Sequence, residues 1–353
     1  MNRLLLFLSY TLLLSFTLTT CQSGTDTNES EQAEEENQEI TLYTHRHYDV
    51  DQEIFQAFED STGIKVNVVN ASADELIEKL KIEGEQSPAD LLLTVDAGRL
   101  VRAKDSNLLR SMTSSNLDST IPAHLKDPEN HWFGLTKRAR IIVYDKEKVD
   151  PAELSTYEAL TDSKWDNKIL IRSSSNIYNQ SLMASIIAND GEGQAQEWAK
   201  GMVENMARPP KGNDRDQVKA IAAGEGEVAI INTYYLGKLL NSKDEAEVQA
   251  GEAVGIFFPN QEDRGAHINV SGIGITKYAP NPEGALRFIE YLVSKNVQEI
   301  FAQANYEYPV NPAANSSELL ASWGDFKADA LPLNKLGELN KQATITFDVA
   351  GWK

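Results

Sequence analysis

Strand-like and helical segments alternate along most of this chain, and this alternation constrains the possible folds more than any other feature. The apolar run ADLLLTV at 89–95 is typical of a buried parallel strand. The segment IKVNVV at 64–69 alternates like a strand with one solvated face, and SADE at 72–75 has the pattern of a capping box that opens a helix. The sequence therefore predicts an α/β protein with parallel sheets.

The same two kinds of segment recur to the end of the chain. Strands are expected at 40–43, 64–69, 89–95, 141–144, 168–172, 227–232 and 254–258. Helices are expected at 50–60, 72–82, 181–188, 194–203, 216–223, 234–240 and 282–292. Because a chain of 353 residues exceeds what one hydrophobic core usually organises, we expect two domains.

Charge and motif content exclude one large class of partners. The chain carries 33 basic and 53 acidic residues, a net charge of −20. A field of that sign repels phosphate backbones, so nucleic acid is not expected as a partner. The sequence also has no Gly-x-Gly-x-x-Gly string and no phosphate-binding loop, so nucleotide binding is not expected either.

The N-terminal segment 1–20 has the pattern of an export signal. Arg3 precedes an apolar run, Leu4–Leu18, that is shorter than a membrane-spanning helix usually needs. The single cysteine, Cys21, follows where a signal would be cut, which resembles the lipoprotein box in which lipid is attached to a new N-terminal cysteine. A secretory signal with an incidental cysteine is the alternative. Lipid attachment would hold an exported protein at a membrane surface without spanning the bilayer.

Residues 21–39 contain seven acidic residues, no basic residue and almost nothing apolar. A segment of this composition cannot bury enough apolar surface to fold by itself. We therefore expect a disordered acidic tether here, and we expect the folded body to begin near Ile40.

Polar clusters follow three of the expected strands. They are His45-Arg46-His47-Tyr48, the segment 172–178 (RSSSNIY) and the segment 232–235 (NTYY). In open α/β sheets, ligands gather beyond the carboxyl ends of the strands. Each cluster also opens an expected helix, whose unpaired N–H groups and dipole favour negative charge.

Four tyrosines lie in these three clusters, which points to a hard metal ion. Phenolate oxygen is a hard anionic donor, Fe³⁺ is a hard, highly charged cation, and tyrosinate is a known iron ligand. Four phenolates and one neutral imidazole would leave a bound Fe³⁺ with a charge of 3 − 4 = −1, which a neighbouring arginine could offset. Each cluster also has a structural alternative, since adjacent tyrosines often pack between core and surface and serine runs often cap helices.

Seven strings in order along the body carry a family resemblance: YTHRHY, SPADLLLTVD, WFGLTKRARIIVYDK, IRSSSNIYNQSL, GEVAIINTYYLGKLL, HINVSGIGITK and NYEYPVNP. With them the chain resembles the ferric-iron-binding proteins of bacterial ABC transporters, especially the tyrosine-rich branch of cyanobacterial iron uptake. The resemblance implies a two-lobed periplasmic-binding-protein fold of class II with a hinge and a central cleft. The lobes are expected at 40–135 plus 262–300 and at 136–261 plus 301–353.

The resemblance also implies the ligands of a Fe³⁺ ion in the cleft. One lobe would supply His47 and Tyr48, and the other would supply the three remaining phenols, Tyr178, Tyr234 and Tyr235. Arg46, next to the proposed histidine ligand, would offset the negative charge of the iron site. The protein would then be an extracytoplasmic, monomeric binding protein that delivers iron to a permease and its ATPase, and it would not be an enzyme.

Two departures from another branch of the family bear on a co-bound anion. Some members place a glutamate ligand where this chain reads Leu93-Thr94-Val95, with no carboxylate at the matching position. Those members also hold an anion on a loop that here reads Ser-Ser-Asn at 174–176, close to Tyr178. Because Tyr178 can supply a phenolate in place of the anion, no synergistic anion is expected.

Two other functions remain as alternatives. An ABC-transporter binding protein for an organic solute, such as a polyamine or a phosphonate, could use the same cleft. Few carboxylates lie in the three clusters for a polyamine, and a phosphonate would leave the tyrosines unexplained. A secreted hydrolase is disfavoured because the chain has no Gly-x-Ser-x-Gly motif.

Overall fold

The structure, a computed structural model, describes residues 38–46 and 48–353. The expected export signal, the proposed lipid-bearing Cys21, the acidic tether up to residue 37 and the proposed ligand His47 lie outside the described residues. Within the described part of the chain, no helix combines the length and apolar character that a membrane crossing requires.

One mixed sheet of nine strands runs through the described body in the order β2-β1-β3-β8-β4-β6-β5, with β7 and β9 also paired to β4. The strands are β1 Glu39–Thr44, β2 Lys65–Asn70, β3 Leu91–Val95, β4 Phe133–Asp145, β5 Ile169–Leu170, β6 Val228–Asn232, β7 Val254–Phe257, β8 Ile268–Ile275 and β9 Tyr308–Pro309. The pairs β1–β2, β1–β3 and β5–β6 are parallel, whereas β8, β6, β7 and β9 all run antiparallel to β4.

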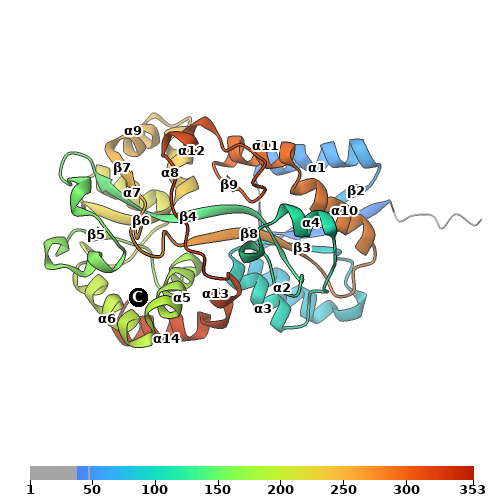
Figure 1. The fold of residues 1–353 in the computed structure, drawn as a ribbon, viewed down its shortest axis with the longest axis horizontal. Coiled ribbons are helices and arrows are strands. Elements are labelled where there is room, and N and C mark those ends of the chain that lie inside the picture. Colours follow the sequence, from blue (N-terminus) through green and yellow to red (C-terminus); the bar gives the residue numbers. More distant parts are fainter. Residues whose placement is uncertain (1–37, 47) are drawn as a thin grey trace, which may run out of the picture. The chain divides into compact units, whose positions relative to one another are not determined.

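The long strand β4 connects two lobes. Its residues 133–139 pair with β8, its residues 140–144 pair with β6, and its residues 142–145 pair with β7. Ala139 is the last residue opposite β8, and the next residue, Arg140, is already opposite Asn232 of β6. Figure 1 shows β4 and β8 side by side where they pass from the first lobe, around β1–β3, toward the second lobe, around β5–β7.

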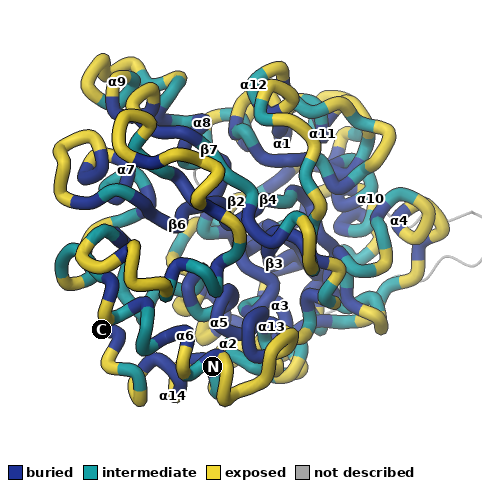
Figure 2. The backbone as a smooth tube through the Cα atoms, turned by 60° about the vertical axis from the view of Figure 1, so that its left-hand side comes forward, coloured by how far each residue is buried: buried dark blue, intermediate teal, exposed yellow. Residues whose placement is uncertain are grey.

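Helices cover both faces of each part of the sheet (Figure 1). Helices α1, α10 and α11 lie on one face of the first lobe, and α2 and α3 lie on the other. The helices are α1 Asp49–Thr62, α2 Ala73–Glu83, α3 Ala97–Asp105, α4 Ser115–Thr120, α5 Ile177–Asp190, α6 Glu192–Glu204, α7 Asp214–Ala222, α8 Thr233–Leu240, α9 Glu245–Ala253, α10 Pro282–Leu292, α11 Lys295–Asn305, α12 Glu318–Ser322, α13 Asn334–Glu338 and α14 Asn340–Ala350. Figure 2 shows the resulting layers, with buried strands inside and exposed residues on the outer helices.

The predicted α/β class is confirmed, and so is the capping box at the start of α2. The Ser72 hydroxyl accepts a hydrogen bond from the Glu75 amide at 3.3 Å, and the Glu75 carboxylate accepts one from the Ser72 amide at 2.9 Å. The expectation of parallel sheets is correct for β1–β2, β1–β3 and β5–β6 and wrong for β8 and β4, which run antiparallel to their neighbours. The division of the chain into lobes at the residues predicted above stays a prediction.

Candidate metal centre

Three strand-to-helix junctions bring four tyrosines into one cluster. Tyr48 is the N-cap of α1, Tyr178 lies in the first turn of α5, and Tyr234 and Tyr235 lie in the first turn of α8. The Tyr234 hydroxyl donates a hydrogen bond to the Tyr178 hydroxyl at 3.2 Å, and the rings of Tyr234 and Tyr235 lie 4.3 Å apart between centroids. We refer to these four residues as the tyrosine cluster.

The tyrosine cluster spans both lobes, since Tyr48 follows β1 and the other three belong to the second lobe. Burial raises the pKa of Tyr48 above its usual value, and the carboxylate of Glu307 raises it further. Burial is also the largest cause that raises the pKa of Tyr234 and of Tyr235. The neighbouring phenol of Tyr178 is the second largest cause for both. These phenols therefore hold their protons at neutral pH until a cation replaces those protons.

Arg46 lies beside the tyrosine cluster, but two carboxylates already oppose its charge. Its Nε and Nη2 donate to the two carboxylate oxygens of Asp51, both at 3.0 Å, and its Nη1 donates to Glu307 Oε2 at 3.2 Å. Burial alone would lower the pKa of Arg46, but Asp51 and Glu307 together hold that pKa above its usual value. Its Cζ lies 4.9 Å from the centroid of the Tyr48 ring.

Three further cations surround the phenols. The Nζ of Lys238, one helical turn after Tyr234, lies 3.6 Å from the centroid of the Tyr48 ring, and burial lowers the pKa of Lys238 to about 8. The guanidinium carbons of Arg138 and Arg172 lie 5.8 and 5.6 Å from the centroid of the Tyr178 ring. Neither Lys238 nor Arg138 was predicted from the sequence as part of the site, although the position of Lys238 four residues after Tyr234 places both residues on one face of the helix.

A buried ion network fixes the junctions that carry the second-lobe phenols. Asp214 is fully buried, and its Oδ2 accepts hydrogen bonds from Arg140 Nη1 and from the Asn232 amide, both at 2.9 Å. Its Oδ1 accepts one from Arg172 Nη1 at 3.2 Å, while Arg140 Nη2 reaches the side-chain oxygen of Asn179 at 2.8 Å. The start of α5 and the start of α8 are thereby tied to the same carboxylate.

Replacing Asp214 with asparagine is expected to destabilise the protein by about 3–5 kcal/mol, because the buried Arg140 and the partly buried Arg172 lose the carboxylate that pairs with both. Urea unfolding of the apo protein measures this loss. The Glu338→Gln variant breaks an exposed ion pair with Lys335 and serves as the control, with an expected cost below about 1 kcal/mol. Equal stability of the two variants would contradict the role given to the network.

Glu307 is a buried carboxylate next to the tyrosine cluster and was not predicted from the sequence as part of the site. It is 3% exposed, and its Oε1 accepts hydrogen bonds from the Thr136 hydroxyl at 2.9 Å and the Ser271 hydroxyl at 3.2 Å. Burial alone would raise the pKa of Glu307, but Arg46, Arg138 and Lys238 hold it below its usual value. The only sequence signal for Glu307 was its place in the string NYEYPVNP.

Asn176, at the end of the serine loop, caps α5. The hydroxyls of Ser173 and Ser175 lie 2.9 Å apart, and the side-chain oxygen of Asn176 accepts a hydrogen bond from the Tyr178 amide at 3.1 Å. At the end of β3, Asp96 follows Val95, but its carboxylate accepts hydrogen bonds from the Ser181 hydroxyl at 2.7 Å and 2.9 Å. The carboxylate nearest to that strand end is therefore engaged between α3 and α5.

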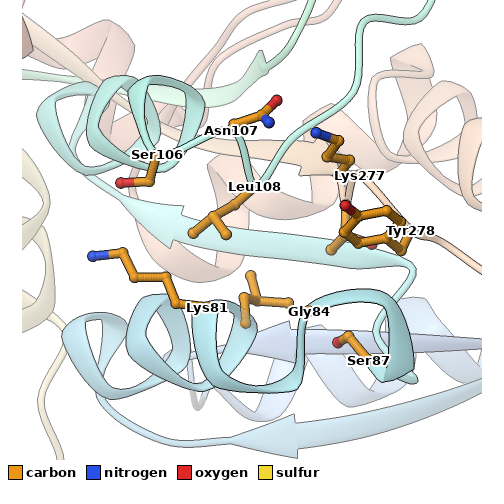
Figure 3. A pocket seen from close by; sticks show the side chains of 10 residues that line it. Lys81, Gly84, Ser87, Ser106, Asn107, Leu108, Lys277 and Tyr278 are labelled. Atoms are coloured by element: carbon orange, nitrogen blue, oxygen red, sulfur yellow. The ribbon is translucent and has the colours of Figure 1, made fainter.

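Two other features of the described residues lie apart from the tyrosine cluster. Asp127, Glu129 and His131 could together offer metal ligands, but Lys104 Nζ already lies 2.8 Å from Asp127 and 2.9 Å from Glu129. A pocket of about 260 Å³ in the first lobe is lined by residues that include Lys81, with none of the four tyrosines (Figure 3). Neither feature contributes to the site built by the strand-to-helix junctions.

The chain is similar in sequence and fold to known binding proteins. Residues 53–328 match the family described as bacterial extracellular solute-binding proteins. The chain is 52% identical over 318 residues to iron uptake protein A1 of Synechocystis, covering 90% of this chain and 88% of that protein. It is 29% identical over 320 residues to the major ferric iron-binding protein of Neisseria meningitidis, covering 89% and 93%. The solved structure of a Trichodesmium protein in complex with iron and citrate has a TM-score of 0.87 and 51% identity, covering 89% of this chain and 100% of that one.

Proposed function

The chain belongs to the bacterial extracellular solute-binding proteins, and on that basis we propose that it is the iron-binding component of an ABC transporter. It captures Fe³⁺ outside the cytoplasm, in the cleft between its lobes, and delivers the ion to a permease and its ATPase. It is a transport protein and not an enzyme. Its relatives are likewise named for iron uptake and for ferric iron binding. The observation that carries the proposal is the meeting of phenols from both lobes in one cluster.

The proposed ligands are the four phenolates of the tyrosine cluster and the imidazole of His47, which directly precedes Tyr48. Four anionic oxygens and one neutral nitrogen suit Fe³⁺ better than a softer or less charged ion. The resulting charge of 3 − 4 = −1 lies among the side chains of Arg46, Arg138 and Lys238. Arg46 contributes less than expected from its position, because Asp51 and Glu307 already oppose it.

Ligands from two lobes make closure depend on iron. An ion held by Tyr48 on one side and by the three second-lobe phenols on the other binds the closed form more tightly than the open form. The permease would recognise the closed form. We further propose that the protein acts as a monomer, tethered to the membrane surface by a lipid on Cys21. Mass spectrometry of protein extracted from membranes would detect that lipid.

We propose that binding needs no synergistic anion. Two contacts support this proposal: the hydroxyls of Ser173 and Ser175 lie 2.9 Å apart, and the Tyr178 hydroxyl accepts a hydrogen bond from Tyr234, so its phenolate can serve in place of an oxygen from an anion. The structure of the Trichodesmium protein contains citrate as well as iron. Iron could therefore reach the present protein as a citrate chelate. Delivery as a chelate and binding without an anion are compatible, because the chelator can leave when the phenols replace its oxygens.

A titration without carboxylate or phosphate tests the proposal. Ferrous chloride added to the apo protein without oxygen, then exposed to air, is expected to produce a visible absorption band from tyrosinate-to-iron charge transfer. The band is expected to reach its maximum at one iron per chain and to stay unchanged when citrate or phosphate follows. No band in the wild-type protein, together with binding of a polyamine or a phosphonate by calorimetry, would favour the organic-solute alternative.

A further inference from the structure

The short segment that follows α11 has an unusual backbone. Tyr306, directly after the helix, has φ 57° and ψ 35°, the left-handed conformation that side chains other than glycine adopt rarely. The turn lets Glu307 enter the interior, and Tyr308 then pairs with Lys137 of β4. A strained residue of this kind persists only where its surroundings hold it firmly.

Tyr306 packs directly on the helix that carries two phenols of the tyrosine cluster. A Cβ atom added to Gly237 in α8 would lie 2.6 Å from both Cβ and Cγ of Tyr306. Only a glycine therefore allows this close approach of the helix and the ring. Gly237 lies two residues after Tyr235 and directly before Lys238, so the contact falls on the first two turns of α8.

Glu307, the next residue, contacts the other lobe. Its carboxylate accepts a hydrogen bond from Arg46 Nη1 at 3.2 Å, and in the sequence Arg46 directly precedes the proposed ligands His47 and Tyr48. The Thr136 hydroxyl of β4, at 2.9 Å, holds the same carboxylate in place. Tyr306 thus contacts α8, which carries proposed ligands of the second lobe. Glu307 contacts Arg46, which lies next to the proposed ligands of the first lobe.

We propose that Tyr306 and Glu307 are positioning residues that align the two halves of the iron site with each other. Tyr306 sets the position of α8 through Gly237, and Glu307 sets the loop before α1 through Arg46. The inference rests on the proposed function, because the alignment matters only if the phenols share one ion. Glu307 also places a negative charge among the cations near the site, so it affects the electrostatic potential at the iron as well as the geometry.

Three variants test the two contacts. Gly237→Ala drives a methyl group into Tyr306, Tyr306→Ala removes the ring without a clash, and Glu307→Gln removes the charge with little change of shape. Each is expected to weaken iron binding by about tenfold to a hundredfold, because small displacements of ligands are costly in a site of fixed geometry. Gly193→Ala, in α6 where an added Cβ meets nothing within 4 Å, is the control with unchanged binding.

Two readouts separate positioning from a general loss of stability. The reduction potential of bound iron is expected to rise in Glu307→Gln, which removes a negative charge, and to change less in Tyr306→Ala. The double variant Tyr306→Ala with Glu307→Gln is expected to lose no more affinity than the worse single variant, since either change breaks the same alignment. The inference would be overturned if the affinity losses of the two single variants multiplied in the double variant and the reduction potential of bound iron stayed unchanged in Glu307→Gln.

The wild-type protein in the same assay separates this inference from the proposed function. If wild-type protein gives no tyrosinate band, the proposed function fails. If it gives the band and all three variants bind iron with the same affinity and spectrum, the proposed function stands and the inference about residues 306 and 307 fails.

Discussion

Changing Tyr234 and Tyr235 together to phenylalanine is expected to abolish iron binding and the visible charge-transfer band. The substitution keeps both rings, whose centroids lie 4.3 Å apart, and removes two of the four proposed phenolate ligands. It also removes the hydroxyl that donates to Tyr178. Absorption spectroscopy of the iron-loaded protein and competition with a chelator measure the loss.

The fold is expected to survive this change. A single hydrogen bond between hydroxyls contributes about 1 kcal/mol to stability, so apo unfolding in urea should change by no more than that. Tyr278→Phe is the matched control, because Tyr278 is 41% exposed and lines the separate pocket of the first lobe. Iron binding and a normal band in the double variant would remove Tyr234 and Tyr235 from the proposed ligands.

Iron binding is also expected to release protons and therefore to weaken steeply as pH falls. The pKa values of Tyr48, Tyr234 and Tyr235 all lie above their usual value, with burial the main cause, so these three phenols are protonated at neutral pH. Each must lose its proton to bind Fe³⁺. At least three protons per iron correspond to a change of about a thousandfold in apparent affinity for each pH unit.

Proton release can be measured directly in weakly buffered solution with a pH indicator as iron is added, after subtraction of a blank without protein. The Tyr48→Phe variant should release one proton fewer per bound iron than the wild-type protein. Competition with a chelator at several pH values gives the slope independently. A slope below two protons per iron would show that the buried phenols do not ionise on binding.

The sequence predicted the place of each tyrosine because that place is set locally. Tyr178 and Tyr234 each follow a strand and open a helix, and short-range patterns are enough to find such junctions. The convergence of the phenols depends on the order of strands in the sheet, and the family resemblance supplied that step. Strand β8 was not predicted from the sequence, because Gly272 and Gly274 weaken the strand pattern there.

The charged residues around the tyrosine cluster were harder to predict. Glu307 reaches Arg46 across 261 positions of sequence, and Arg140 reaches Asp214 across 74. No periodicity connects such partners, since the pairing of β4 with β6, β8 and β9 brings their elements together. Arg140 lies within β4, opposite Asn232 of β6, and its place in a buried ion network follows only from tertiary structure.

The transfer of pairing between Ala139 and Arg140 has a consequence for how the protein would let iron go. Because the lobes share a continuous strand, they cannot drift apart as bodies on a flexible tether would; they can only rotate about the place where β4 changes partners. Such a rotation withdraws Tyr48 from all three second-lobe phenols at the same time. We therefore expect unloading to occur in one concerted event, without a long-lived species in which the ion keeps some of its oxygens and has lost the rest.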